Sequence, residues 1–395
     1  MGSAAARSQI RILESLTYLD NASAGPLPDA TRRALVEFAE LWASRGEPWE
    51  EGWRAVYESK KLFASLVGAS LEEVAAFPGV TYALAVTLSS LRLRDGCVAV
   101  ASSLNFPTST AVLKSMARRG LLREVRIARE TGGLVELDEY RRLVDDSVCL
   151  VVADYVGWLS GHVESLRELS EIAHARGAIL VTDAFHAVGV MPVDVRLLGV
   201  DVMVTGSYKW LMAPHGAALA FVSRDIVEEL DPSYAGWLAL EDSVVSRILR
   251  GEPEFARPID IENLELARDA RKLEWGTLPL VSFYALRESL RFLLQHEAVE
   301  VFESHTRRLA ARLIDELEDL GLEVYTPRER HSAIVTFKHP EPRLVAGELA
   351  RRGIIVAARP GLVRVSPHFY NNYEDIEKLV GALEEILRAR RTKDS

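Results

Sequence analysis

Cysteine is scarce in this sequence. The 395 residues include two, Cys97 and Cys149, and each lies in an apolar run. Two thiols are too few for a disulfide-stapled scaffold or a cysteine-rich metal site, so we expect no metal and two buried, reduced core cysteines of a cytoplasmic protein. No stretch reaches the roughly 18 uninterrupted apolar residues that a membrane span requires, and Met1–Ser8 lacks the apolar core of a signal peptide. We therefore expect no membrane partner.

Positive charge is also in short supply. The sequence has 47 basic residues against 57 acidic ones and a formal net charge of −10, which argues against nucleic acid as a general partner. With 48% hydrophobic and 26% charged residues, the chain is typical of globular proteins rather than disordered or collagenous ones. At roughly 150 residues per domain, the length predicts two or three domains.

Strand-like and helical segments alternate through the first half of the chain. Apolar runs rich in β-branched residues predict strands at 97–101, 147–155, 178–182, 200–205 and 217–222. Helical periodicity predicts helices at 29–45, 48–67, 82–91, 108–119 and 166–176. Continuous apolar strands separated by helices are typical of an α/β fold, in which a mostly parallel sheet is covered on both faces.

The pattern changes after residue 230. Polar and proline-containing segments extend to about residue 263. Beyond them, helices are predicted at 280–295, 299–320, 344–352 and 374–390, and strands at 333–337, 354–358 and 362–365. This part of the chain therefore predicts a smaller α+β domain.

Two of the predicted strands lead into reactive side chains. The strand 178–182 runs into Asp183, and the strand 200–205 is followed closely by Lys209. Ligands of parallel sheets bind at the carboxyl ends of the strands, so this amine and this carboxylate should meet at one rim. Lys209 is one of eight lysines in an arginine-rich chain, and a buried lysine can lose its proton whereas arginine cannot. A structural lysine that caps a strand is the alternative.

An amine and a carboxylate at one rim are what pyridoxal 5'-phosphate (PLP) requires, because lysine forms a Schiff base and the carboxylate keeps the pyridine nitrogen protonated. Together with further motifs, they give the chain a resemblance to the class V aminotransferase family of PLP enzymes, whose members include cysteine desulfurases, isopenicillin-N-epimerase-like proteins and kynureninases. The matching segments are Tyr18–Ala22, Gly25–Pro28, Gly79–Thr81, Asn105–Thr108, Asp183–Gly189, Gly206–Leu211, Pro214–Gly216, Glu274–Thr277 and Arg364–Pro367.

The resemblance extends from Tyr18 to about Leu387 and implies PLP fold type I. That fold would give a large PLP-binding domain at 29–262, with a sheet of the seven-stranded type, and a small C-terminal domain at 263–395. The N-terminal segment 1–28 would line the active site and pack on the small domain.

The resemblance also implies roles around the cofactor ring. Lys209 would form the internal aldimine and then shuttle a proton, and Asp183 would pair with the pyridinium nitrogen. His186 would hydrogen-bond near the phenolic oxygen, and Phe106 would stack on the ring. The alternatives are a helix N-cap for Asp183 and ordinary core packing for His186 and Phe106.

For the phosphate, backbone N–H groups at the start of the helix 82–91 would form an anion cup. Val80 stands where the family has a threonine, so only its backbone can serve. The resemblance assigns phosphate contacts to Val80, Thr81, Ser207, Tyr208 and, from a neighbouring subunit, Gly276 and Thr277. It therefore implies a homodimer with shared active sites; an ordinary turn is the alternative for Gly276 and Thr277.

For the substrate, Arg364 matches the arginine that grips the α-carboxylate with a two-pronged pair. Arg359 lies close by in the sequence and could compete for this role. Asn21 and Tyr155 are expected to line the same pocket. Trp158 is either a pocket wall or a core residue.

The reaction depends on residues outside these shared motifs. A desulfurase needs a mobile cysteine shortly before the carboxylate arginine, and the segment 354–364 contains none. Kynureninases share the Asn-Phe-Pro-Thr motif, but they carry an aspartate directly after it, whereas this sequence has Ser109. We predict an aminotransferase that uses a small α-amino acid and a 2-oxo acid, through external aldimine, quinonoid and ketimine. A Cβ lyase, a hydrolase or an epimerase of the same fold is the alternative, and a non-catalytic scaffold is the other class of function.

Overall fold

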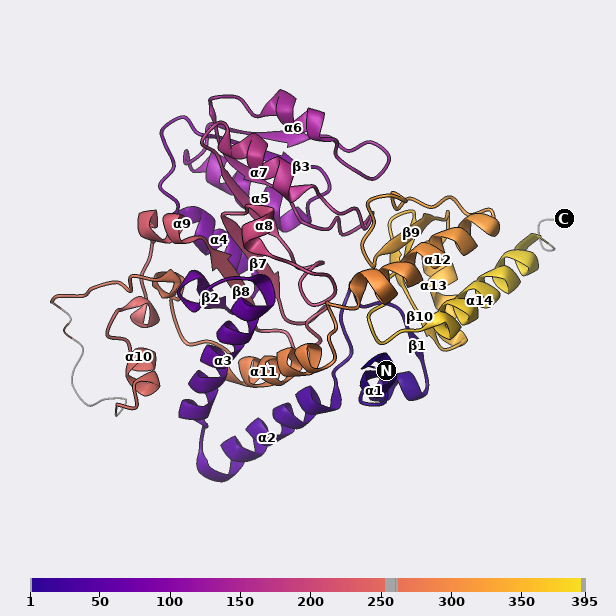
Figure 1. The fold of residues 1–395 in the computed structure, drawn as a ribbon, viewed down its shortest axis with the longest axis horizontal. Coiled ribbons are helices and arrows are strands. Elements are labelled where there is room, and N and C mark those ends of the chain that lie inside the picture. Colours follow the sequence, from indigo (N-terminus) through magenta and orange to yellow (C-terminus); the bar gives the residue numbers. More distant parts are fainter. Residues whose placement is uncertain (1, 253–259, 261, 392–395) are drawn as a thin grey trace.

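The computed structural model describes residues 2–252, 260 and 262–391 (Figure 1). It is built around a central sheet of seven strands. The strands are β2 (Val74–Phe77), β3 (Val98–Ser102), β4 (Glu124–Ala128), β5 (Val148–Val152), β6 (Ile179–Asp183), β7 (Val202–Gly206) and β8 (Ala218–Val222). They follow the order β2-β8-β7-β6-β5-β3-β4. The strands from β3 to β7 run parallel, whereas β8 is antiparallel to both of its neighbours. The predicted α/β fold with a mostly parallel sheet is confirmed.

Successive residues of the strands face two different hydrophobic layers. Along β3, Val98 and Val100 belong to one buried cluster, while Ala99 and Ala101 belong to the other. The helices α4 (Val80–Ser90) and α5 (Pro107–Arg118) contribute to the second cluster, and α3 (Trp49–Val67), α7 (Leu166–His174) and α11 (Leu280–Gln295) contribute to the first. Because both faces are covered, the strands can be apolar throughout.

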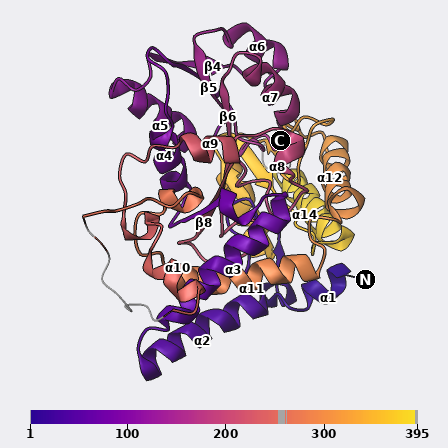
Figure 2. The same ribbon diagram turned by 60° about the vertical axis from the view of Figure 1, so that its left-hand side comes forward.

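The helix α11 packs against α3 and against α2 (Asp29–Arg45), and the three form a helical layer below the sheet in Figure 2. The remaining helices are α1 (Gly2–Arg7), α6 (Leu137–Leu143), α8 (Val195–Leu198), α9 (Arg224–Glu229), α10 (Val244–Leu249), α12 (Arg307–Asp319), α13 (Pro342–Arg351) and α14 (Tyr373–Arg391). None of the helices in the described part of the chain has the length and apolar character needed to cross a membrane.

A second, smaller sheet lies toward the C-terminus. Its antiparallel strands are β9 (Val335–Lys338), β11 (Ala357–Arg359) and β12 (Leu362–Val365), in the order β11-β12-β9. The N-terminal strand β1 (Thr17–Tyr18) pairs with β10 (Ile354–Ile355), so the first residues of the chain lie beside its last third (Figure 1). The predicted domain boundaries at residues 28 and 262 stay predictions.

The structure departs from the predicted elements in several places. The predicted helix 299–320 is wrong in its first turns, because a π-helical turn at Phe302–Thr306 precedes α12. The predicted strand 354–358 is divided into β10 and β11, which pair with different strands. The two edge strands β2 and β4 had not been predicted. In β4, Glu124 and Arg126 break the apolar pattern by which a strand is recognised.

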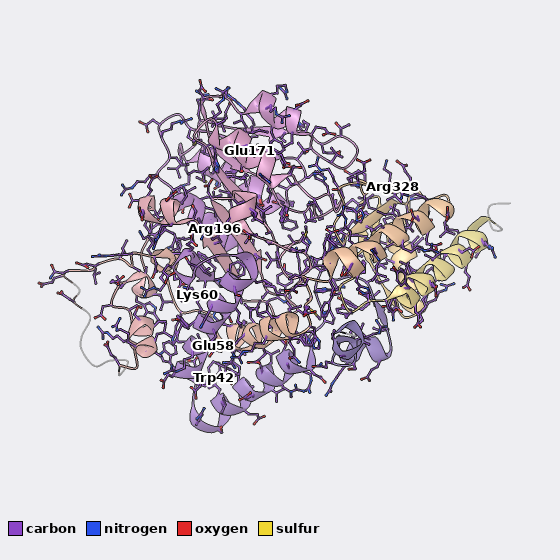
Figure 3. The ribbon with its side chains drawn as sticks, viewed as in Figure 1. Trp42, Glu58, Lys60, Glu171, Arg196 and Arg328 are labelled. Atoms are coloured by element: carbon purple, nitrogen blue, oxygen red, sulfur yellow. A yellow bond between two sulfur atoms is a disulfide. The ribbon has the colours of Figure 1, made fainter. Side chains whose placement is uncertain are left out.

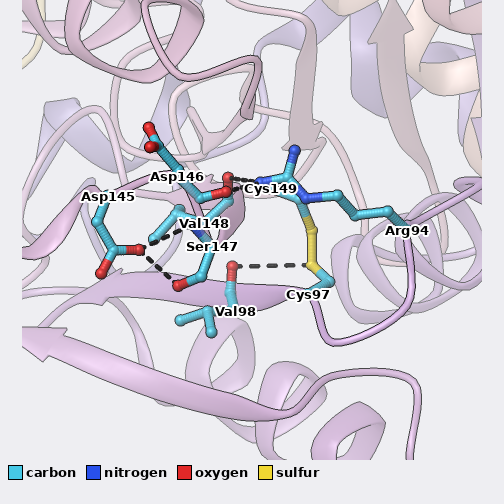
Figure 4. Close-up of a disulfide and its surroundings, with 8 residues drawn as sticks. All are labelled: Arg94, Cys97, Val98, Asp145, Asp146, Ser147, Val148 and Cys149. Carbon is cyan, nitrogen blue, oxygen red and sulfur yellow. Dashed lines mark hydrogen bonds between the residues drawn. A yellow bond between two sulfur atoms is a disulfide. The ribbon is translucent and has the colours of Figure 1, made fainter.

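The expectation of two reduced cysteines is wrong: Cys97 and Cys149 form a disulfide (Figure 4). Both are buried, as expected. Cys97 directly precedes β3 and Cys149 lies in β5, and these two strands are neighbours in the sheet, which brings the two Cα atoms to 5.6 Å. The sequence separates the two residues by 52 positions, and the strand order that joins them is not visible in it.

Removal of this disulfide by Cys97→Ser should destabilise the chain. A crosslink across 52 residues restricts the unfolded ensemble by roughly 4 kcal/mol in the loop-entropy model. We expect a lower thermal midpoint for the variant than for the oxidised protein, measured by circular dichroism without reductant. In dithiothreitol the difference between the two proteins should shrink. Equal midpoints without reductant would show that the bond does not contribute to stability.

Candidate active site

The catalytic candidates gather where the parallel strands end. Asp183 is the last residue of β6, and β7 ends at Gly206, three residues before Lys209. Asp183 lies opposite Val204 in the ladder between the two strands, so the loops that follow them leave the sheet side by side. The structure therefore brings this amine and this carboxylate to one rim.

Lys209 is buried, and its Nζ lies near the aromatic rings of Phe106 and Phe185. Its Nζ is 3.0 Å from His186 Nε2 and 4.1 Å from the centroid of the Phe185 ring. Burial lowers the pKa of Lys209 to about 8, while the negative charge of Asp183 opposes this shift. Burial also lowers the pKa of His186 well below its usual range, and the positive charge of Lys209 adds to that effect. A neutral His186 therefore accepts a hydrogen bond from Lys209.

Asp183 is held in place by the backbone that follows it. Its Oδ1 accepts a hydrogen bond from the N–H of Phe185 at 2.8 Å. Burial raises the pKa of Asp183 to about 6, whereas this hydrogen bond and the charge of Lys209 act in the opposite direction. The carboxylate can thus share a proton near neutral pH, which suits a partner for a basic ring nitrogen.

The pKa of Lys209 predicts how stability depends on pH. In the protein without cofactor, the unfolded chain keeps a proton on Lys209 above pH 8, whereas the folded chain has released it. Because the unfolded state binds more protons, the free energy of unfolding should rise with pH from about 8 into the ordinary lysine range. We expect the difference in unfolding free energy between wild type and Lys209→Met, measured in urea, to follow this rise. A difference that is independent of pH contradicts the lowered pKa.

The N-terminus of α4 lies beside the end of β7. A Cβ atom added to Gly206 would come within 2.9 Å of Val80 Cγ2, so the Val80 side chain packs against the end of β7. Gly79 caps α4 without a side-chain hydrogen bond, and Thr81 follows Val80 in the first turn. The first N–H groups of the helix, together with its dipole, can therefore bind an anion at the rim.

Ser207 and Tyr208 lie between β7 and the reactive lysine. The hydroxyl of Ser207 donates to the carbonyl of Pro214 at 2.5 Å. The ring of Tyr208 stacks on His215 with centroids 4.0 Å apart, and burial raises the pKa of Tyr208. The Ser207 hydroxyl is thus already engaged within the chain, whereas the Tyr208 ring is fixed by stacking.

Gly276 and Thr277 follow an anchored glutamate. Glu274 Oε1 accepts hydrogen bonds from Nζ of Lys60 at 2.7 Å and from the N–H of Ala76 at 3.0 Å. Lys60, labelled in Figure 3, comes from α3, and this ion pair is buried. Thr277 itself is exposed, and its contact with a neighbouring subunit stays a prediction.

Phe106 stands at the N-terminus of α5, near Lys209. Its ring centroid is 5.6 Å from Lys209 Nζ, and 39% of the residue is exposed. The Trp158 ring meets it edge to face, with centroids 5.5 Å apart. Trp158 is thus a neighbour of the candidate stacking residue, as the pocket-wall alternative expects.

Arg364 extends from β12 toward the same pocket and is 1% exposed. Its Nη1 donates to the carbonyl of Trp158 and its Nη2 to Ser23 Oγ, both at 2.8 Å. Arg359 Nη2 donates to the same Ser23 oxygen at 2.7 Å. Within the described residues, Nε of Arg364 is buried without a hydrogen-bond partner. A carboxylate ligand could supply that partner.

The N-terminal loop closes directly on the lysine. A Cβ atom on Gly25 would meet the carbonyl oxygen of Lys209 at 2.2 Å, so only glycine allows this approach. Asn21 is fully buried, and its amide donates to Ser366 O and accepts from the Tyr370 hydroxyl. These bonds hold the loop, and the predicted contact of Asn21 with substrate stays a prediction.

Tyr155 lies beyond the end of β5. Its N–H donates to the carbonyl of Asp183 at 2.9 Å, and burial raises its pKa to about 12. Tyr155 is therefore adjacent to the pocket and neutral at physiological pH. The predicted contact of Tyr155 with substrate also stays a prediction.

Sequence analysis missed two polar contributors to this site. Ser23 receives hydrogen bonds from both arginines. Asp154 comes just after β5, as Asp183 comes at the end of β6. It was not recognised as a site residue because it was placed inside the predicted strand 147–155. Its position after an apolar run at a strand end was the signal that could have found it.

The family model for aminotransferase class V matches residues 17–379. The chain belongs to this family. The family's enzymes use PLP, so PLP is the cofactor, and they act on amino acids. The predicted family, fold type I and cofactor are thereby confirmed.

Similar proteins carry several different names. An uncharacterized aminotransferase, YcbU of Bacillus subtilis, is 25% identical, with 95% of this chain and 94% of the relative covered. A probable cysteine desulfurase of Aeropyrum pernix is 28% identical over 98% of each chain, and a kynureninase of Bacillus thuringiensis is 27% identical over 95% of this chain and 89% of the relative. A cysteine desulfurase structure from Thermococcus onnurineus superposes with a TM-score of 0.85 at 21% identity, over 98% of each chain.

The residues present at the rim of the class V enzyme fit PLP. They offer an amine with a lowered pKa, a buried carboxylate, and a helix N-terminus without a side-chain cap. Nδ1 of His186 is buried without a hydrogen-bond partner in the described part of the chain. An oxygen of a bound cofactor could satisfy this nitrogen.

Proposed function

We propose that this class V enzyme is an aminotransferase that moves the amino group of a small α-amino acid to a 2-oxo acid. The observation that carries the proposal is the buried Lys209, whose lowered pKa leaves part of the amine unprotonated next to the neutral His186. A reaction that takes a proton from one carbon and returns it to another needs such a base at the centre of the site.

Each side chain would have one task. When bound, PLP acts as an electron sink that acidifies the Cα–H bond of the amino acid. Nζ of Lys209 accepts the Cα proton and later returns it, while Asp183 keeps a proton shared with the pyridine nitrogen. Arg364 binds the α-carboxylate, and the Phe106 ring, which Trp158 meets edge to face, would stack on the cofactor.

Chemistry that forms a persulfide on the protein has no support in this site. Cys97 precedes β3, so the disulfide lies at the amino ends of the parallel strands, whereas the candidate site lies at their carboxyl ends. These two are the chain's only cysteines. Elimination or hydrolysis at Cβ, or epimerisation, remains the alternative and is equally compatible with the relatives.

The deciding experiment follows the absorbance of the purified protein during titration with a panel of amino acids. Transfer predicts loss of the yellow cofactor band, together with the matching 2-oxo acid in the mass spectrum. Addition of a second 2-oxo acid should restore the band. Release of pyruvate, alanine or an epimer while the yellow band persists would instead establish a lyase, a hydrolase or an epimerase.

We also propose that the enzyme is a homodimer with shared sites. The support is Thr277, which is exposed to solvent and closely follows Glu274, a residue held in place by its ion pair with Lys60. Light scattering should give twice the mass of 43.8 kDa. A fully active monomer would exclude the role of Thr277 at a neighbour's phosphate.

A further inference from the structure

A second buried carboxylate lies next to Asp183. Asp154 follows β5 by two residues and is 7% exposed. The neighbouring Tyr155 donates its N–H to the carbonyl of Asp183, so Asp154 and Asp183 occupy the ends of adjacent strands. None of the roles described above uses Asp154.

Both oxygens of Asp154 bind the loop that precedes α5. Oδ2 accepts from the N–H of Phe106 at 2.5 Å, and Oδ1 accepts from Ser109 Oγ at 3.1 Å. Asn105 completes the attachment, because its Oδ1 accepts from the N–H of Asp154 and its Nδ2 donates to Val152 O, both at 2.9 Å. The end of β5 is therefore fastened to this loop by four hydrogen bonds.

The position of Phe106 depends on its backbone. The residue is 39% exposed, so burial fixes its side chain only in part; the ring meets Trp158 edge to face and lies 5.6 Å from Lys209 Nζ. As the N-cap of α5, Phe106 has no side-chain hydrogen bond of its own. The bond from its N–H to Asp154 thus attaches the backbone that carries the ring to the end of β5.

We propose that Asp154 is a positioning residue, whose hydrogen bond from the N–H of Phe106 holds the Phe106 ring against the cofactor at Lys209. The inference rests on the proposed function for the place of the cofactor, but not for the reaction that follows. Ser109, which stands where kynureninases carry aspartate, is here the hydrogen-bond donor to a carboxylate from the next strand.

The test measures amide hydrogen exchange at Phe106 and the Kd of PLP in three variants. Asp154→Ala removes both acceptors, so exchange at Phe106 should rise about tenfold or more and PLP should bind about ten- to hundredfold more weakly. Asp154→Asn removes the charge, but its carbonyl can accept from Phe106 while its amide donates to Ser109. We expect it to restore both readouts to within about threefold of wild type, since each bond survives.

Ser109→Ala is the matched control, because it removes one hydrogen bond and leaves the bond to Phe106. Its exchange at Phe106 should remain near the wild-type rate. If Asp154→Ala does not fold, Asp154→Ser replaces it, since a serine is polar but too short to reach Phe106.

Two results would overturn the proposal. Unchanged exchange at Phe106 without the carboxylate would show that Asp154 does not hold the loop. Equal losses in Asp154→Asn and Asp154→Ala would show that its charge matters rather than its hydrogen bonds. Neither readout requires turnover, so a failed transamination assay leaves this inference standing, and its own failure leaves the transamination assay unaffected.

Discussion

Lys209→Ala should abolish covalent attachment of PLP and lower amino-group transfer by roughly 10²- to 10⁴-fold, the range for loss of a positioned acid–base group. The reason is local: Lys209 is the amine that burial keeps partly unprotonated beside His186 and Asp183. Borohydride reduction followed by mass spectrometry should fix PLP to the peptide that contains Lys209 in wild type and to no peptide in the variant.

Two further variants separate charge from chemistry in this test. Lys209→Arg keeps the positive charge but cannot deprotonate, so it should fail as Lys209→Ala does. Lys114→Ala removes an exposed lysine on α5 and should leave the adduct unchanged. A borohydride adduct that persists in Lys209→Ala would move the site to another lysine.

The reactive pair was predictable from the sequence because it needs only local information. Asp183 and Lys209 each follow an apolar run, and the ends of parallel strands meet at one rim whatever the strand order. Helix periodicity likewise placed α2 and α11 at their observed bounds, since a continuous apolar stripe is a property of the segment alone.

The rest of the site could not be predicted without knowing the order of the strands in the sheet. The disulfide and the bonds of Asp154 to Phe106 and Ser109 both join the ends of β3 and β5, strands that are about 50 residues apart in the sequence. Nothing local distinguishes Cys97 from an ordinary core residue. Likewise nothing local distinguishes Ser23, which bridges two arginines of a distant hairpin. Its role becomes visible only in the fold, where β1 pairs with β10.

Arg364→Lys should raise the KM for the amino acid by about ten- to hundredfold, which corresponds to about 1.5–3 kcal/mol for one charged hydrogen-bonding group. Lysine retains the charge but lacks the planar fork, so it cannot bind the carboxylate with a two-pronged pair while it replaces the bond to the carbonyl of Trp158. We expect little change in the Kd of PLP, because Arg364 extends from the small sheet rather than from the rim that carries Lys209.

Arg359→Lys decides between the two arginines that share Ser23. Arg359 is half-buried, whereas Arg364 is almost completely buried and has an unpaired Nε in the described part of the chain. A ligand carboxylate therefore relieves a desolvated donor only at Arg364, and Arg359→Lys should raise KM by less than about threefold. If steady-state kinetics instead show the larger increase for Arg359→Lys, the α-carboxylate is bound by Arg359, and Arg364 serves to hold Trp158 and Ser23 in place.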